Sequence, residues 1–327
     1  MKSLSSRCLL CLLLIPKPCW SADLASGSWE VQWDAGAKTC AAEPPADPIQ
    51  VHRYNAQTMV LREKLCATWE APFMYLLIGS SRALLIDTGD IADPIAMPLE
   101  RTVLGLLPGE AGAKMPLLVV HSHGHLDHRA GDIQFERTGA RVVPSDLIHV
   151  REFFGFAQWP TGIAQIDLGD RIVDVLPAPG HHPAQLVFYD RNTGLVLSGD
   201  FLLPGRLLVD NFNDYEASAR RIADFLKDRP VSFVLGGHIE KDRAGKLLTW
   251  ESTDHAGEHV LQLPKSDIED LPGALQKFNG LYSETGSFVI ENPIRILIGL
   301  ATGALLTLIA LSVLIIRFIR RRRRRTA

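Results

Sequence analysis

Four histidines within eight positions, directly after a short apolar segment, constrain the fold of this chain more than any other feature. Residues 117–120 are wholly apolar and predict a short buried strand. The run His121-Ser-His-Gly-His-Leu-Asp-His128 follows this segment at once. Neutral imidazole is a common ligand for zinc, and carboxylate is a harder partner for the same ion. The run therefore predicts a metal site next to the end of this strand.

The spacing within the run suits two neighbouring ions. His123 and His125 are two positions apart, so an extended or looped backbone can direct both rings into one pocket. Asp127 and His128 are adjacent, so their side chains diverge and can serve a second ion. We interpret His121, which precedes this set, as a neighbouring structural residue.

Further ligand-type residues stand at the ends of other apolar segments. His181, Asp200 and His238 each directly follow a glycine at such an end. Glycine lets the backbone approach a crowded site closely. A structural role for all these polar groups would require many buried hydrogen bonds, so the pattern favours a metal centre.

Taken together, these residues resemble the metallo-β-lactamase superfamily. The family's order is kept by His123-x-His-x-Asp-His128 and by the later Gly-His, Gly-Asp and Gly-His pairs. The segment Leu-Ile-Asp87-Thr-Gly matches the aspartate turn that precedes the histidine motif in that family. The resemblance covers about residues 70–240. It implies an α/β fold, the four-layer αβ/βα sandwich, with metals at one edge between two sheets.

The resemblance also implies a ligand set for two divalent metal ions: His123, His125 and His181 for the first ion, Asp127, His128 and His238 for the second, and Asp200 as a bridge between them. Asp87 would orient the site from behind the ligands. Asp127 is the implied catalytic residue as well, because it can take the proton of an attacking water. Zinc is the expected metal, and iron and manganese are alternatives.

An enzyme is the implied function, and we expect it to hydrolyse a small ester-like bond, such as a thioester or lactone, with a metal-bridging hydroxide. A β-lactamase is an alternative, but those enzymes usually lack an aspartate at the position of Asp200. A persulfide dioxygenase is another, with one iron held by residues that match His123, His181 and Asp200. Metal content separates these cases, since hydrolysis calls for two zinc ions and the oxidation for one iron.

Hydrophobic runs of strand length recur on both sides of the motif. Residues 73–78 and 82–86 flank a Gly-Ser-Ser turn and predict a β-hairpin. Residues 215–227 have the apolar spacing of an amphipathic helix, for which Asn213 or Asp214 is the expected cap. Such mixed strands and helices predict an α/β protein with its sheets inside. We divide the chain into N-terminal strands and a loop (22–69), the core (70–240), and a C-terminal extension with a stalk (241–293).

Both ends of the chain indicate a membrane protein. Residues 1–21 begin with basic residues and continue through a short apolar stretch, as a secretory signal peptide does, and an uncleaved anchor is the alternative. The stretch 296–316 carries no charge, so residues 294–316 are long enough for a transmembrane helix. The basic tail 317–327 follows and is expected in the cytoplasm. This predicts a single-pass protein whose body is extracytoplasmic.

Charge and cysteine content add two expectations. The formal net charge is −3, but the two ends carry eleven cations and no acid, which leaves −14 on the body. An acidic body argues against a nucleic-acid partner and for a small-molecule substrate. Cys40 and Cys66 remain after removal of the signal peptide. In an oxidising compartment we expect one disulfide between them, with two free thiols as the alternative.

Overall fold

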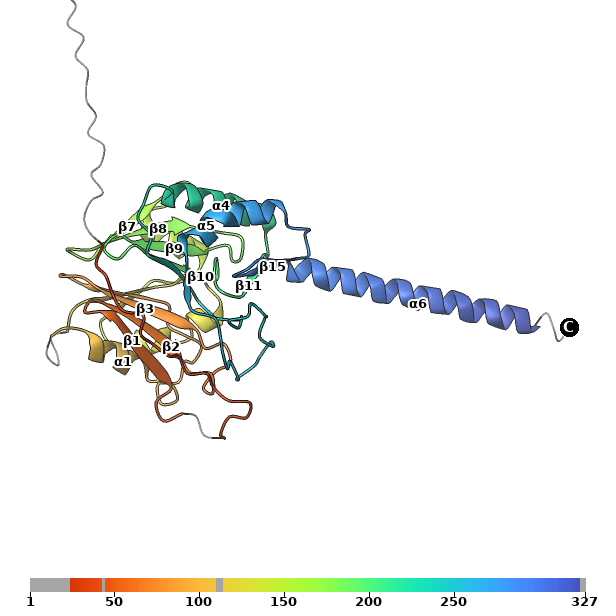
Figure 1. The fold of residues 1–327 in the computed structure, drawn as a ribbon, viewed down its shortest axis with the longest axis horizontal. Helices are drawn as coiled ribbons and strands as arrows, with labels where there is room; N and C mark the ends of the chain where they lie inside the picture. Colours follow the sequence, from red (N-terminus) through yellow and green to blue (C-terminus); the bar gives the residue numbers. More distant parts are fainter. Residues whose placement is uncertain (1–23, 43–44, 110–113, 324–327) are drawn as a thin grey trace, which may run out of the picture.

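The computed structural model describes residues 24–42, 45–109 and 114–323 (Figure 1). The expected signal peptide, residues 1–21, lies outside these described residues. The elements have the following bounds: β1 Ile49–Asn55, β2 Thr58–Glu63, β3 Phe73–Ile78, β4 Ala83–Ile86, α1 Leu99–Leu106, β5 Leu117–Val120, η1 (a 3-10 turn) Leu126–His128, α2 Asp132–Phe135, β6 Arg141–Val142, α3 Leu147–Phe154, β7 Ala164–Asp167, β8 Ile172–Pro177, β9 Leu186–Asp190, β10 Leu195–Gly199, β11 Arg206–Leu208, α4 Phe212–Leu226, β12 Phe233–Gly236, β13 Gln262–Leu263, α5 Lys265–Gln276, β14 Tyr282–Glu284, β15 Val289–Glu291 and α6 Pro293–Arg323.

Two six-stranded sheets form the centre of the molecule. Their strand orders are β1-β2-β3-β4-β5-β6 and β13-β12-β10-β9-β8-β7. The expected hairpin is present, since β3 and β4 pair antiparallel, with Ile78 opposite Ala83. Helices α4 and α5 cover the outer face of one sheet and α1 that of the other (Figure 1). The predicted αβ/βα sandwich is therefore confirmed.

Alternation along the strands explains why both faces of each sheet are buried. In β3, Phe73 and Tyr75 belong to the cluster between the two sheets, whereas Met74 and Leu76 belong to a second cluster that includes Val103 of α1. Successive side chains of a strand point to opposite faces, so one fully apolar strand serves two cores at once. A third cluster joins the other sheet to α4 and α5.

Helix α4 differs from its prediction at the start. It begins at Phe212 rather than at residue 215, and its cap is Asn211 instead of Asn213 or Asp214. The Asn211 side chain accepts a hydrogen bond from the backbone N–H of Asp214, which satisfies one of the free donors of the first turn. The Phe212 ring stacks on that of Phe278, a residue that follows α5 and is remote in sequence.

Residues 241–293, expected as a C-terminal extension with a stalk, contain regular structure that packs on the body. This segment forms β13, which extends the second sheet, and α5, which packs against α4. It also supplies β14 and β15 to a three-stranded sheet of order β11-β15-β14. The extension is thus part of the folded body rather than a spacer.

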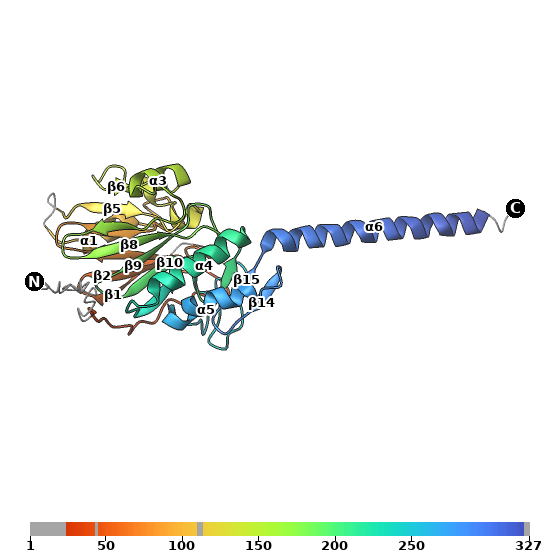
Figure 2. The same ribbon diagram turned by 90° about the horizontal axis from the view of Figure 1, so that it is seen from above.

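The last helix, α6, projects from the body as a single rod (Figure 2). Its segment Pro293–Phe318 has a mean hydropathy of 2.4 and is not buried, which makes it a candidate membrane span by length and composition. The described part of the basic tail continues this helix to Arg323.

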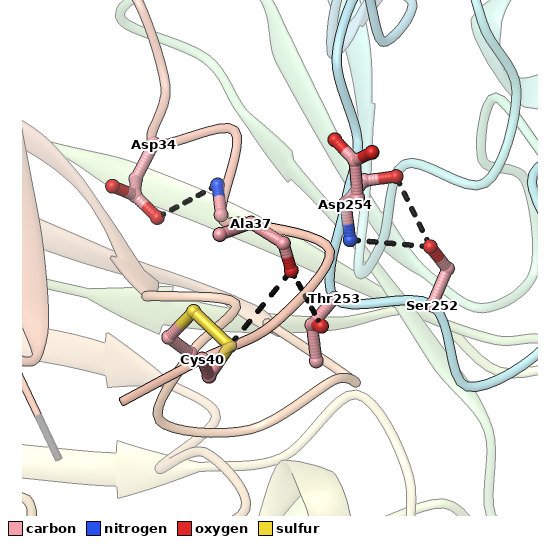
Figure 3. The surroundings of a disulfide bond; sticks show 8 residues. Asp34, Ala37, Cys40, Ser252, Thr253 and Asp254 are labelled. Atoms are coloured by element: carbon pink, nitrogen blue, oxygen red, sulfur yellow. Dashed lines mark hydrogen bonds between the residues drawn. A yellow bond between two sulfur atoms is a disulfide. The ribbon is translucent and has the colours of Figure 1, made fainter. Parts of the chain in front are cut away.

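A disulfide between Cys40 and Cys66 ties the N-terminal arm to the loop after β2. The arm lies beside the loop that contains Thr253, as Figure 3 shows. The Ala37 N–H donates to Thr253 O at 2.8 Å, and the Thr253 hydroxyl donates to Ala37 O, also at 2.8 Å.

Candidate metal centre

The ligand-type residues of the sequence motif meet at one edge of the sandwich. The run from His121 follows β5, His181 follows β8, Asp200 follows β10, and His238 follows β12. The pairs β4–β5 and β10–β12 are parallel, so their carboxyl ends lie at the same edge of each sheet. The fold thereby brings all seven expected ligands into two adjacent groups.

The first group consists of His123, His125 and His181. His123 Nε2 lies 2.9 Å from His125 Nδ1, and His181 Nε2 lies 3.1 Å from that same atom. His181 Nε2 and His123 Nε2 are 3.3 Å apart. Three imidazole nitrogens therefore face one point.

The second group consists of Asp127, His128, Asp200 and His238. Asp127 Oδ2 lies 3.1 Å from both His128 Nε2 and His238 Nε2. Asp200 reaches both groups, because its Oδ1 is 3.4 Å from His128 Nε2 while its Oδ2 is 3.7 Å from His181 Nε2. Asp200 thus lies between the two groups.

The outer nitrogens of three of these rings are held by acceptors. His128 Nδ1 lies 2.9 Å from Asp87 Oδ2, His181 Nδ1 lies 3.0 Å from Leu208 O, and His238 Nδ1 lies 2.8 Å from Glu70 O. Each Nδ1 donates in these contacts, so each ring, in the neutral form that binds a metal, turns the lone pair of Nε2 inward.

The inward-facing atoms leave a strong demand for positive charge. Lone pairs and carboxylate oxygens face one another at close range, and Asp200 Oδ1 is buried without receiving a hydrogen bond. Buried acceptors without donors are costly. A metal cation at each group removes this cost, and rings fixed from behind by acceptors are the usual arrangement of metal-binding histidines. The residues present therefore fit the metals that the resemblance implies.

Asp87 lies behind the centre in a strained backbone conformation. It is 1% exposed and has a φ of 67°, which is uncommon for a residue other than glycine. Its Oδ1 accepts from the Ser122 N–H at 2.6 Å, and its Oδ2 accepts from the Ser122 hydroxyl at 2.8 Å. Because Oδ2 also holds His128, the strain serves to fix the histidine loop. Ser122 was not predicted, although it stands inside the motif.

Electrostatics distinguish the two groups. Burial and the neighbouring imidazoles lower the pKa of His123 well below its ordinary value, so this ring is neutral. In the second group burial also disfavours charge, but the carboxylates of Asp200 and Asp127 raise the pKa of His238 to about 10. Burial acts against ionisation of Asp127, yet His128 and His238 hold the pKa of its carboxyl far below the usual range. Negative charge is thus retained where a cation would sit.

Other histidines and aromatic residues of interest lie outside the two groups. His121 contacts Asp132 Oδ1 at 2.8 Å and Val143 O at 3.1 Å, which gives it structural partners. Tyr215 is fully buried and donates to Phe201 O. His255 is 7% exposed.

Two clefts adjoin the candidate ligands. One is lined by Gly124, Arg129 and His182 and lies beside the first group. The other includes His238 itself, and its walls also come from parts of the chain that are far apart in sequence: Trp69 and Glu70, Arg206, Glu240, and Trp250. His125 is exposed to solvent, so the centre is open to a substrate. Trp69 and Trp250 were not predicted, because nothing in either local sequence connects them.

Comparison with known proteins agrees with this geometry. The model of the metallo-beta-lactamase superfamily matches residues 67–238. Human acyl-coenzyme A thioesterase MBLAC2 is 28% identical over 224 residues, which cover 57% of this chain and 80% of the relative. A hydroxyacylglutathione hydrolase from Anaeromyxobacter dehalogenans (strain 2CP-C) is 30% identical over 133 residues, covering 40% of this chain and 46% of the relative. Among solved structures, a metallo-beta-lactamase from Pontibacter korlensis has a TM-score of 0.49 and 15% identity, covering 70% of this chain and all of that one.

The chain belongs to the metallo-beta-lactamase superfamily. It is a metal-dependent hydrolase of that fold, and the His/Asp groups that hold divalent metals in such proteins are present.

Proposed function

We propose that this protein is a membrane-anchored hydrolase with two metal ions that cleaves acyl thioesters. The observation that carries the proposal is the pair of inward-facing acceptor groups, with Asp200 reaching both. The thioester is proposed because relatives that cover 57% of this chain are named acyl-coenzyme A thioesterases.

Seven residues would hold the metals: His123, His125 and His181 the first, Asp127, His128 and His238 the second, and Asp200 both. When bound, two zinc ions supply Lewis acidity, which makes a water molecule nucleophilic near neutral pH and polarises the substrate carbonyl. Nitrogen and carboxylate donors together suit zinc, and they leave iron and manganese as the alternatives to be tested.

The reaction adds the oxygen of water to the thioester carbonyl carbon and breaks the carbon–sulfur bond, so that a carboxylate and a thiol are released. Asp127 is the residue we assign to hold the proton of the attacking water. Its carboxylate side chain is 18% exposed, at the open side of the centre. Its Oδ2 is oriented by His128 and His238, while Asp87 keeps His128 in place from behind.

The same proposal includes the arrangement in the membrane. Residues 1–21 would direct export, the body would lie outside the cytoplasm, α6 would span the bilayer, and residues 317–327 would stay in the cytoplasm. The apolar helix and the cationic residues after it support this topology. The disulfide is compatible with it, because such bonds persist in oxidising compartments.

A matched pair of histidine variants tests the function. The full-length protein in detergent is assayed for thiol release from acyl thioesters and for bound metal by mass spectrometry. His123→Ala should abolish turnover, whereas His149→Ala, on an exposed side chain of α3, should preserve it. Two zinc ions per chain with thioester hydrolysis would support the proposal. One iron per chain with oxygen consumption on a persulfide would refute it.

A further inference from the structure

The start of α6 is fixed to the body without a flexible linker. β15 ends at Glu291 and α6 begins at Pro293, so only Asn292 lies between them. Asn292 is 3% exposed, its N–H donates to Leu281 O at 3.0 Å, and its Oδ1 accepts from the Arg295 N–H at 2.9 Å. The orientation of the body relative to this helix is therefore set by hydrogen bonds.

The strand pair that carries α6 also supports the candidate metal centre. β15 pairs in parallel with β11, with Glu291 opposite Leu208. Leu208 O is the acceptor that holds the outer nitrogen of His181. Both views place β15 at the start of α6, and Figure 1 also shows β11 there (Figures 1 and 2). The metal centre and the candidate membrane span thus lie at the same end of the body.

Four apolar side chains lie beside these two features, three of them exposed and one half-buried. We call Trp69, Trp250, Leu281 and Tyr282 the apolar rim. Trp250 is 51% exposed, Leu281 48% and Tyr282 40%. Trp69 and Trp250 form a pair at 5.4 Å beside His238. Leu281 and Tyr282 lie next to Asn292. Tyr282 is the first residue of strand β14, and Leu281 precedes it.

Arg206 contacts Trp250, and one strand lies between it and Tyr282. Its guanidinium lies 5.4 Å from the ring centroid of Trp250, and it donates to Leu248 O at 2.7 Å. Arg206 begins β11, and β15 separates this strand from Tyr282 on β14. Tryptophan and tyrosine side chains, which have an apolar body and a polar tip, are favoured at the surface of a bilayer.

The cleft beside His238 is narrow, with a volume of about 20 Å³, and therefore has no room for a long acyl chain. Besides the two tryptophans, Glu70, Arg206, Glu240 and Glu251 line it. A chain of methylene groups placed there would meet charged walls, whereas the bilayer would lie directly beyond the rim.

We propose that the apolar rim rests on the bilayer that α6 spans, and that the substrate is an amphiphile whose acyl chain stays in the membrane while its thioester enters the centre. This inference rests on the proposed thioesterase function and on the membrane placement of α6. The fixed start of α6 would hold the centre at the level of the headgroups.

A flexible insertion separates the rim from the membrane without touching the centre. About 20 glycine and serine residues, with a mean span of about 25 Å, are inserted between Asn292 and Pro293. The control carries the same insertion after Ala327. Full-length proteins in phosphatidylcholine vesicles are assayed with butanoyl and hexadecanoyl thioesters of one water-soluble thiol.

The insertion at Asn292 should lower hexadecanoyl turnover by about tenfold or more and leave butanoyl turnover unchanged. The flexible linker lets the body move away from the membrane surface, which lowers the effective concentration of the centre at that surface. The double variant Leu281→Ser and Tyr282→Ser should act in the same direction, and Ile148→Ser, a 75% exposed residue of α3, should not. Equal effects on the two substrates, or none on either, would overturn the inference and leave the hydrolase standing. A parent protein that cleaves neither thioester would instead overturn the proposed function, and this inference with it.

Discussion

Replacing Gly237 with alanine tests the second ligand group through packing alone. A Cβ at this position would lie 2.4 Å from Asp200 Oδ1 and 2.8 Å from His128 Cε1. Ordinary contact begins near 3.4 Å, so the carboxylate must retreat by about 1 Å. The backbone cannot retreat instead, because the Gly237 N–H donates to Gly199 O at 2.9 Å and its carbonyl accepts from the Phe73 N–H at 2.8 Å.

The expected cost in folding free energy is about 1–3 kcal/mol, as for other overpacked interiors. The expected cost in turnover is larger, about 100-fold, because reacting groups misplaced by about 1 Å lose most of their effectiveness. Metal analysis should show fewer than two ions per chain.

Gly105→Ala provides the matched control. This glycine lies in α1 with no atom within 4 Å of the added Cβ, so the change should stabilise the helix slightly and leave turnover unaltered. Thermal unfolding, metal content and thioester kinetics are measured for both variants. If Gly237→Ala kept both metals and the parent turnover, Asp200 and His128 would not be joint ligands as we propose.

Three further predictions concern other parts of the centre and body. Asp127→Ala should lower turnover by about 10³-fold or more with the fold retained by circular dichroism, and parent-like turnover would show that Asp127 neither binds metal nor holds the proton. Cys40→Ser should destabilise the body by about 3.5 kcal/mol, because the bond to Cys66 closes a loop with a sequence separation of 26; an unchanged denaturant midpoint would contradict this. Burial raises the pKa of Glu63 to about 8, so the folded state holds a proton that the unfolded state loses above about pH 4.5, and stability should fall between these values as pH rises. Glu63→Gln should therefore raise the melting temperature at pH 9 but not at pH 4, and a pH-independent difference would count against a protonated Glu63.

Most residues of the candidate centre could be predicted from the sequence, because the patterns that indicate them are local. Each ligand follows an apolar strand, and neighbouring parallel strands end at the same edge of a sheet. The sequence therefore predicted that His123, Asp200 and His238 lie close together. The hairpin of β3 and β4 could also be predicted, since a short turn separates two apolar runs. The hydrogen-bond acceptor of each ring could not be predicted from the local sequence. Leu208 O, which lies behind His181, is an example, since it is a backbone atom of a short strand.

The structure of residues 241–293 was harder to predict from the sequence, because non-local contacts stabilise it. β14 and β15 have three residues each, too few for a periodic pattern, and they exist through pairing with one another and with β11. Helix α5 contains Pro272, which reads as a break in a helix. His255 is buried beside Glu258, which pairs with Arg62 of β2 at 2.6 Å, and Arg62 is remote from both residues in sequence.

The disulfide gives a physical reason why two loops can wall the cleft beside His238. Cys66 stands three residues before Trp69, so the bond fixes one wall directly. Its other end, Cys40, stands three residues after Ala37, which is bonded to Thr253 in the loop that carries Trp250. Loops without strand partners lose much entropy when they are ordered, and a covalent tie reduces that loss by restricting the unfolded chain. A compartment that maintains the disulfide would thus also maintain the two loops beside His238, which links the extracytoplasmic placement we propose to the structure around the second ligand group.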